Sequence, residues 1–149
     1  MLRVNAVASI RGATPEDADT LVGLVRDANL AVPGLIDHLE SFLVAERDGR
    51  PIGAIGLELR DDSALLRSAV VSPAERGAGI GGALFSAVLD LARREGVRTL
   101  YLLTTSAEDY WARHGFARVA RDVVPDAVRQ SDEFIGACPA SAVAMMRAV

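Results

Sequence analysis

The sequence is poor in disulfide-forming and metal-binding side chains: its 149 residues include one cysteine, Cys138, and two histidines, His38 and His114. A single cysteine cannot form an intramolecular disulfide. One cysteine and two histidines are also too few for a structural zinc site made from these residue types. We therefore expect no disulfide framework and no bound metal.

An excess of positive charge is also lacking, since 16 Lys and Arg residues face 20 Asp and Glu residues, for a net charge of −4. The chain thus lacks the field that draws proteins onto nucleic acids or anionic lipids. No apolar run approaches the ~20 residues of a membrane span, and Asn5, Ser9 and Arg11 break up the N-terminal apolar stretch. We expect a soluble, cytoplasmic protein with no nucleic-acid or membrane partner.

The chain does contain enough apolar residues for one core. Half of its residues are hydrophobic and 24% are charged, and its length matches the usual size of one compact domain. No internal repeat or linker is visible in the sequence. We therefore expect a single domain over residues 1–149.

Turn and capping residues divide the chain into helices and strands. Thr14 and Pro15 suit the start of a helix, Asp48-Gly49 suits a hairpin turn, and Gly96 suits the end of a helix. We expect helices over residues 15–28, 81–94 and 108–114, and strands over residues 6–11, 42–46, 51–59, 64–72, 100–104, 116–120 and 142–146.

The order of these elements predicts an α+β fold. Residues 100–104 are nearly all apolar, which favours a strand buried on both faces and parallel to its neighbour. The other strands follow one another in hairpins, which are antiparallel. We expect a mixed, largely antiparallel central sheet of about six to seven strands with helices on both faces.

A glycine-rich loop, Arg76 to Gly82, separates an expected strand from the most regular helix. Helix N-termini present unpaired N–H groups, and glycines let a phosphate approach them closely. The loop lacks the Lys-Ser/Thr pair of a P-loop, which argues against nucleoside triphosphate hydrolysis. Gly77, Gly79 and Gly82 also match the dinucleotide pattern G-x-G-x-x-G, but several residues separate the strand from Gly77, and the next strand ends in Thr104-Thr105 rather than in an acid for the ribose. A plain strand-to-helix turn is the alternative without a ligand.

Three motifs resemble the GNAT N-acetyltransferases, over about residues 8–120. Arg76-x-x-Gly79-x-Gly81 resembles the acetyl-CoA signature of that family. Residues 42–53 resemble its second and third strands, and Tyr110-Trp111-x-x-x-Gly115-Phe116 resembles its aromatic-x-x-x-Gly-Phe segment. The resemblance implies a GNAT fold and acetyl transfer from acetyl-CoA to a small-molecule amine.

Other segments resemble one branch of that family, the arsenic-resistance N-acetyltransferases. They are residues 64–68, 100–105 and 138–142, so this resemblance covers nearly the whole chain. It implies a detoxification or arsenic-resistance role, with a small amine or amino-acid analogue as acceptor. Cys138 is favoured as a pocket wall over an arsenic ligand, because trivalent arsenic prefers several sulfurs and this chain has one.

The resemblance also assigns residues to the cosubstrate. The pantetheine arm would lie along Ala69, Val70 and Val71, and the N–H near Val71 would stabilise the oxyanion of the intermediate. Arg76 would add positive charge near the phosphates. The pyrophosphate would rest on the backbone amides of Gly77, Ala78, Gly79, Ile80, Gly81 and Gly82.

Two glutamates are candidates for the base that deprotonates the acceptor. Glu58 projects opposite to its aliphatic neighbours, and Arg67 interrupts the apolar run one strand over. Two interpretations of Glu58 therefore stand side by side: it forms a structural ion pair with Arg67, or it is the general base. Arg67 is also a candidate for binding an anionic group of the substrate. Glu46 is favoured as a solvated carboxylate, with a substrate-pocket role as the alternative.

The aromatic motif departs from the family pattern, in which a tyrosine at the second aromatic position is the usual general acid. Here Tyr110 is first and Trp111 second, and an indole N–H is only a hydrogen-bond donor. Because the two residues lie ~100° apart on a helix, Tyr110 is not expected to replace that acid. We expect Tyr110 in the substrate pocket, Trp111 against the thioester region and no side-chain acid.

Two functions therefore compete. The first is an acetyl-CoA-dependent N-acetyltransferase that works by direct attack of the amine, with a homodimer left open. The second is a non-catalytic acyl-CoA sensor, because the glycine loop specifies only binding. The acidic residues near the C-terminus are expected mainly on a solvated loop: Asp122, Asp126, Asp132 and Glu133.

Overall fold

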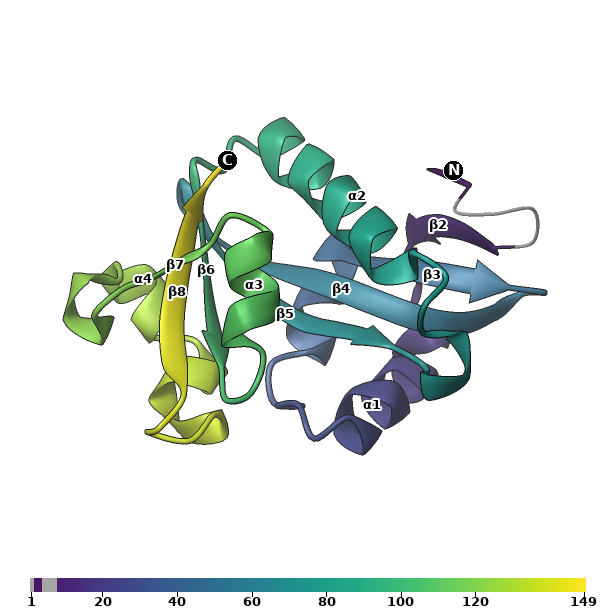
Figure 1. The fold of residues 1–149 in the computed structure, drawn as a ribbon, viewed down its shortest axis with the longest axis horizontal. Coiled ribbons are helices and arrows are strands. Elements are labelled where there is room, and N and C mark those ends of the chain that lie inside the picture. Colours follow the sequence, from purple (N-terminus) through teal and green to yellow (C-terminus); the bar gives the residue numbers. More distant parts are fainter. Residues whose placement is uncertain (1, 4–7) are drawn as a thin grey trace.

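The computed structural model describes residues 2, 3 and 8–149, and its described part contains an eight-stranded sheet flanked by helices (Figure 1). The strand order is β1-β2-β3-β4-β5-β6-β8-β7. Of the pairs between these strands, β5–β6 is parallel and the others are antiparallel. The strands are β1 Leu2–Arg3, β2 Ala8–Gly12, β3 Phe42–Arg47, β4 Arg50–Arg60, β5 Ser63–Val71, β6 Thr99–Thr104, β7 Ala117–Arg118 and β8 Val143–Ala148.

This architecture confirms the predicted α+β class and the mixed, mostly antiparallel sheet. The Asp48-Gly49 hairpin turn is confirmed too, with both residues at positive φ (53° and 78°). The strand expected over residues 6–11 is observed as β2, and residues 6 and 7 lie outside the described part. The strand expected over residues 116–120 is reduced to β7, because the chain then turns into the 3-10 turn Arg121–Val123.

The helices are α1 Ala18–Asp27, α2 Ile80–Arg94, α3 Glu108–Arg113 and α4 Asp126–Arg129. A 3-10 turn, Pro15–Asp17, precedes α1, so the predicted start at Thr14 marks that turn rather than the α-helix itself. The Thr14 N–H donates to Asp17 Oδ2 at 2.8 Å. The Arg11 guanidinium bonds the same carboxylate and lowers the pKa of Asp17 to about 2.

The two faces of the sheet carry different helices, as Figure 1 shows: α2 and α3 cover one face and α1 the other. The largest apolar cluster lies on the α2 face and includes Ile55, Leu57 and Trp111. The α1 face holds two apolar clusters, one around α1 and one under the segment from residue 119 to residue 134. Because strand side chains alternate, Ala54, Gly56 and Glu58 point to the α1 face.

Strands β5 and β6 pair only over their first three residues. The register joins Ser63–Leu65 to Thr99–Tyr101, and the ladder ends there. Further along β5, Ser68 has a positive φ of 57°, and the β4–β5 register shifts between Ala54 and Gly56. Such irregularities bend a strand and strengthen its twist. The two strands therefore diverge, and the sheet is open between them.

Candidate functional site

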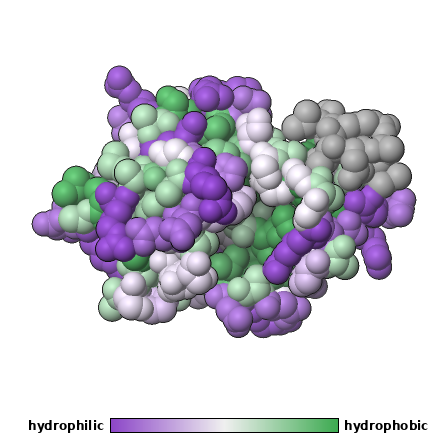
Figure 2. All heavy atoms as spheres, viewed as in Figure 1, coloured by the Kyte–Doolittle hydropathy of each residue, from purple (hydrophilic) through white to green (hydrophobic). Residues whose placement is uncertain are grey.

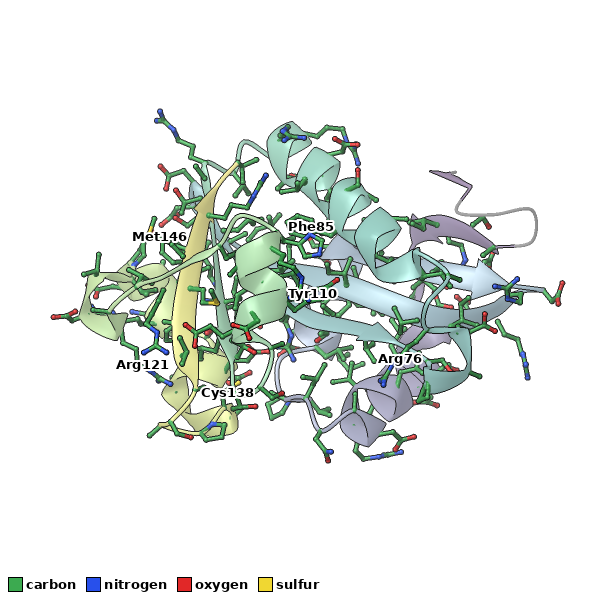
Figure 3. The ribbon with its side chains drawn as sticks, viewed as in Figure 1. Arg76, Phe85, Tyr110, Arg121, Cys138 and Met146 are labelled. Atoms are coloured by element: carbon green, nitrogen blue, oxygen red, sulfur yellow. The ribbon has the colours of Figure 1, made fainter. Side chains whose placement is uncertain are left out.

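A cavity of about 870 Å³ occupies the opening between β5 and β6. Its walls come from both faces of the sheet: from the loop after α1 on one side, and from α2 and α3 on the other. Figure 2 shows the molecule hollowed near the centre of this view, with hydrophobic atoms in its depth. In Figure 3, Arg76, Tyr110 and Cys138 come from three separate segments around this region. The cavity thus connects the two faces of the sheet.

The glycine loop and the first turn of α2 form one end of the cavity. Every predicted loop residue from Arg76 to Gly82 lines it, except Ala78. Gly79 caps α2 with a φ of 80°, which favours glycine. The Ala83 N–H makes the first bond back to the Gly79 carbonyl, so the amides before it have no partner within the helix. This end has the geometry of an anion site.

The glycines also leave room in front of those amides. A Cβ added at Gly77, Gly79 or Gly82 would meet no atom within 4 Å. A Cβ on Gly81 would lie 3.2 Å from the Tyr110 hydroxyl. Space for an incoming ligand is therefore present beside the helix terminus, and Tyr110 borders it.

The open edge of β5 continues from this end into the cavity, where Ala69, Val70 and Val71 all line the wall. The Ser72 N–H donates to the Ile52 carbonyl toward β4. Because successive strand residues alternate, the backbone groups of Val71 face the opening toward β6. Arg76 Nε donates to the Val71 carbonyl at 3.2 Å. The structure therefore brings together the predicted oxyanion position and the predicted phosphate-binding arginine.

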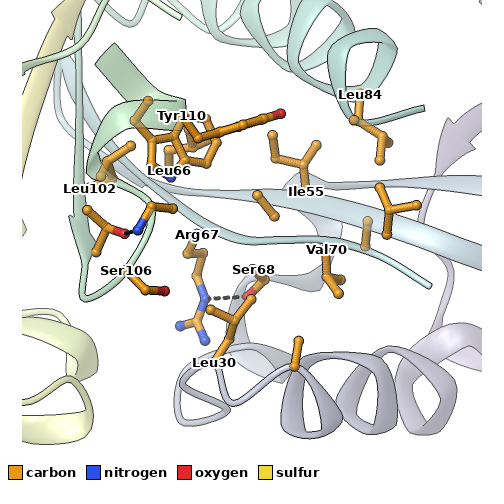
Figure 4. Close-up of a pocket in the computed structure, with 18 of the residues that line it drawn as sticks. Leu30, Ile55, Leu66, Arg67, Ser68, Val70, Leu84, Leu102, Ser106 and Tyr110 are labelled. Atoms are coloured by element: carbon orange, nitrogen blue, oxygen red, sulfur yellow. Dashed lines mark hydrogen bonds between the residues drawn. The ribbon is translucent and has the colours of Figure 1, made fainter. Parts of the chain in front are cut away.

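Both aromatic residues of α3 line the cavity. Trp111 is 8% exposed and packs against Phe85 and Phe116, with ring centroids 5.9 and 5.5 Å away. Tyr110 is less buried and extends toward α2 (Figure 4). Burial raises the pKa of the Tyr110 phenol. The rotation between the two residues thus does not turn Tyr110 out of the cavity.

Arg67 lies on the α1 face of β5 and is 3% exposed. Its Nη1 donates to Glu58 Oε2 at 2.7 Å and its Nε to Ser68 Oγ at 3.1 Å, the latter drawn in Figure 4. Its remaining N–H groups donate to the backbone carbonyls of residues 31–33. The predicted Glu58–Arg67 ion pair is therefore present. Since every nitrogen of Arg67 already donates a hydrogen bond, the arginine is poorly placed to bind a substrate anion as well.

Glu58 is enclosed by basic side chains and does not line the cavity. It is 1% exposed. Besides Arg67, Arg60 Nη2 contacts its Oε1 at 2.6 Å and His38 Nε2 lies 3.3 Å from the same oxygen. This arrangement favours the structural interpretation of Glu58 over the hypothesis that it is the base.

Glu46 is not brought to the cavity. It lies in β3 and accepts a hydrogen bond from Arg11 Nε at 2.8 Å. Both side chains are about one-fifth exposed. The alternative substrate-pocket role of Glu46 is therefore not supported, because its partner is Arg11 of β2, the strand that pairs with β3.

Glu133 lines the cavity, a position that the sequence did not predict. It was expected on a solvated loop, and Asp122, Asp126 and Asp132 are indeed exposed, but Glu133 is 5% exposed and lines the cavity. It begins a short π-helical turn, Glu133–Ala137, that folds over the α1 face. The sequence does not signal this burial, because Asp132 and Glu133 are consecutive acidic residues, and only the fold exposes the first and buries the second.

Cys138 follows this turn and also lines the cavity, as expected for a pocket wall. Burial, followed by the nearby Glu133 carboxylate, raises the pKa of the Cys138 thiol to about 12. The sulfur therefore remains protonated at neutral pH and is a weak nucleophile. Among the residues that the structure describes, no cluster of three or more His, Cys, Asp or Glu side chains is arranged to hold a metal ion. Nor is any described helix long and apolar enough to span a membrane.

Comparisons with known proteins agree on one family. A family model described as "Acetyltransferase (GNAT) family" matches residues 9–118. The amino-acid acetyltransferase of Neisseria meningitidis serogroup A is 27% identical over 136 residues, which cover 84% of this chain and 31% of that protein. The amino-acid acetyltransferase of Mycobacterium tuberculosis is 33% identical over 106 residues, which cover 68% of this chain and 59% of that protein.

The fold has a solved counterpart. N-acetylglutamate synthase from Neisseria gonorrhoeae, complexed with coenzyme A and N-acetyl-glutamate, matches with a TM-score of 0.82 and 25% identity. The match covers 97% of this chain and 35% of that one. This chain thus spans about a third of the length of its Neisseria relatives.

The buried network around Glu58 gives a prediction about stability. We expect Glu58→Gln to lower the free energy of unfolding by about 3 kcal/mol, because it removes the charge of the carboxylate closest to the buried Arg67, at 2.7 Å, and leaves only Glu133 at 3.5 Å. Glu46→Gln is the matched control, and it should cost less than about 1 kcal/mol because the Glu46–Arg11 pair is partly solvated. Urea unfolding measures both. A Glu58→Gln protein with native stability and a turnover reduced at least 100-fold would instead identify Glu58 as the base.

Proposed function

Because this chain belongs to the acetyltransferase (GNAT) family, we propose that it is an N-acetyltransferase that moves the acetyl group of acetyl-CoA to the amine of an amino acid or a similar small molecule. The observation that carries this proposal is the cavity, which runs from the α2 terminus through the gap between β5 and β6 to the other face. One face can hold a cosubstrate while the other admits an acceptor. The names of the relatives and the coenzyme A in the gonococcal structure support it.

The glycine loop would hold the phosphates of acetyl-CoA. Amides of the first turn of α2 would donate to the pyrophosphate, and the positive end of the helix dipole would favour its charge. Arg76 would exchange its bond to the Val71 carbonyl for a phosphate oxygen. The open edge of β5 would then pair with the amides of the pantetheine arm.

The acetyl thioester supplies the activated carbonyl, and the chain supplies the groups around it. The N–H of Val71 would stabilise the oxyanion that forms when the amine attacks. Cys138 lines the cavity but stays a thiol, since its pKa is raised to about 12. This favours direct attack of the amine over transfer through an acetyl-cysteine intermediate.

The acceptor would enter from the α1 face. Arginines lining the cavity are Arg67, whose N–H groups are committed, and Arg76 and Arg113, which belong to the α2 and α3 side. The described residues therefore offer no uncommitted arginine for a second carboxylate at the acceptor end. We expect amino acids with uncharged side chains to be better acceptors than L-glutamate.

A free-thiol assay over a panel of acceptors tests this function. The panel contains L-glutamate, L-alanine, propylamine and an amino acid with an arsenic-bearing side chain. Release of CoA that depends on one acceptor supports the enzyme. Tight acetyl-CoA binding without turnover would favour the alternative, a non-catalytic acyl-CoA sensor. Selective turnover of the arsenic compound would support the detoxification role that the sequence resemblance implies.

Binding of acetyl-CoA at the loop predicts the effect of Gly82→Val. Gly82 lines the cavity in the first turn of α2, and an added Cβ meets no protein atom, so the variant should fold. The new side chain would obstruct the amides, and losing one charge-assisted hydrogen bond of ~1.5–3 kcal/mol weakens affinity at least tenfold. Calorimetry measures this loss.

Gly12→Val is the control for that experiment, because Gly12 lies in β2, outside the cavity, and a Cβ there also meets no atom within 4 Å. Its acetyl-CoA affinity should match that of the unmodified protein. Unchanged affinity in a folded Gly82→Val protein would remove the phosphate site from this loop.

Tyr110→Phe should retain turnover within about fivefold. A CoA thiol has a pKa near that of cysteine, ~8.5, so the thiolate can leave and take a proton from water. The Tyr110 hydroxyl also lies beside Gly81, at the end we assign to the phosphates. The pH profile of kcat checks this expectation: a 100-fold loss together with disappearance of the alkaline limb would make Tyr110 the acid.

A further inference from the structure

A polar cluster separates the two apolar clusters of the α1 face. The cluster around α1 includes Phe42 and Val70, and the cluster under the C-terminal segment includes Leu65 and Tyr101. Between them on β5 lie Arg67 and Ser68, which are 3% and 6% exposed. The buried carboxylate of Glu133 reaches this point from the turn above β5. The acceptor end of the cavity is therefore polar, while its surroundings are apolar.

Glu133 differs from Glu58 in how firmly it is paired. Its Oε2 lies 3.5 Å from Arg67 Nε, whose own hydrogen bond goes to Ser68 Oγ. Arg67 gives its short contact, 2.7 Å, to Glu58. Glu133 thus feels the arginine's charge without a short hydrogen bond from it. Unlike Glu58, Glu133 lines the cavity.

The other carboxylates lining the cavity lie elsewhere. Glu75 belongs to the loop before α2 and is held by Arg47 at 2.8 Å. Asp109 belongs to α3, on the α2 face of the sheet. Of the carboxylates that line the cavity in the described part of the chain, Glu133 is the one at the acceptor end.

From this placement we infer that Glu133 binds the acceptor's ammonium group and removes its proton. This inference rests on the proposed acetyltransferase function and assigns its base to the C-terminal turn rather than to β4. Burial raises the pKa of Glu133 to about 7, against the opposing effect of Arg67. A carboxylate titrating in this range is suited to proton transfer near neutral pH.

The proton balance of the step is complete. Glu133 takes one proton from the ammonium, and the freed nitrogen lone pair attacks the thioester carbonyl to form the C–N bond. Collapse of the intermediate breaks the C–S bond and releases the thiolate of CoA. The second proton leaves the nitrogen for water, the thiolate takes a proton from water, and Glu133 returns the first proton to solvent.

Several charged groups set the protonation of Glu133. Arg67 of β5 favours its ionised form, while Glu58 of β4, on the other side of Arg67, opposes it. Within its own segment, the Cys138 thiol forms a hydrogen bond with Glu133. Below pH 7 the carboxyl holds a proton and cannot accept another, so kcat/KM should rise as the pH increases through about 7.

Glu133→Gln tests the inference with acetyl-CoA and the best acceptor of the panel. We expect kcat/KM to fall about 10²–10⁴-fold, with acetyl-CoA affinity unchanged within twofold. The rise of kcat/KM near pH 7 should disappear, so that only the rise caused by deprotonation of the acceptor's own amine remains. The variant should fold, because a neutral isostere replaces a buried charge. A folded variant that keeps kcat/KM within threefold, or keeps the rise near pH 7, overturns the assignment.

Two further variants make the test specific. Asp132→Asn removes the same charge from the preceding, exposed residue and should leave kcat/KM within twofold. Glu133→Asp keeps the charge but withdraws it by one methylene. It should retain the rise near pH 7 while losing at least tenfold in kcat/KM, and native activity in this variant would contradict a positioned base. If Glu133→Gln does not fold, Glu133→Asp takes its place in the test.

Failure of the proposed function gives a different result. An unmodified protein that releases no CoA with any acceptor would refute acetyl transfer while leaving amine binding measurable. Calorimetry with propylamine, in the presence of CoA, then tests Glu133 alone. Affinity should fall at least tenfold in Glu133→Gln, and equal affinities would overturn its role in binding the ammonium.

Discussion

The early end of the β5–β6 ladder is the constraint on which the site depends. Parallel strands that paired along their full length would seal the sheet, but pairing stops at Leu65 and Tyr101. The positive φ of Ser68 and the register shift opposite it turn β5 away. Through the resulting gap the α2 terminus and the α1 face share one cavity. A single interruption of the hydrogen-bond ladder thus creates the place where two substrates can meet.

Burial of Arg67 follows from that geometry. The strand turns this side chain into the α1 face, where water is excluded and an unpaired guanidinium would be costly. Glu58, Ser68 and the carbonyls of residues 31–33 surround it. The network joins β4, β5 and the loop after α1, so it fixes one wall of the acceptor end. Glu133 completes that wall from the C-terminal segment and, unlike Glu58, is open to the cavity.

The structural elements that depend on local sequence patterns were predicted well. The 3.6-residue period before Gly96 gave α2, the Asp48-Gly49 pair gave the β3–β4 hairpin, and the apolar run at 100–104 gave a parallel strand. Alternation along β4 placed Glu58 opposite to Ile55 and Leu57 and anticipated its ion pair with Arg67. Each of these depends on neighbours a few residues away or one strand over.

The sequence alone determined the sheet, the glycine loop and the family resemblance, because periodicity, turn chemistry and spacing are properties of consecutive residues. Only the tertiary structure decided which carboxylate faces the cavity. Glu46 pairs with Arg11 of β2, and Glu58 contacts Arg60, Arg67 and His38. Glu133 lies on a turn that the acidic sequence pattern predicts to be solvated, but the fold places it in the cavity. The physical reason is that the burial of a charged side chain depends on which segments, distant in the sequence, pack around it. A local sequence pattern does not specify those segments.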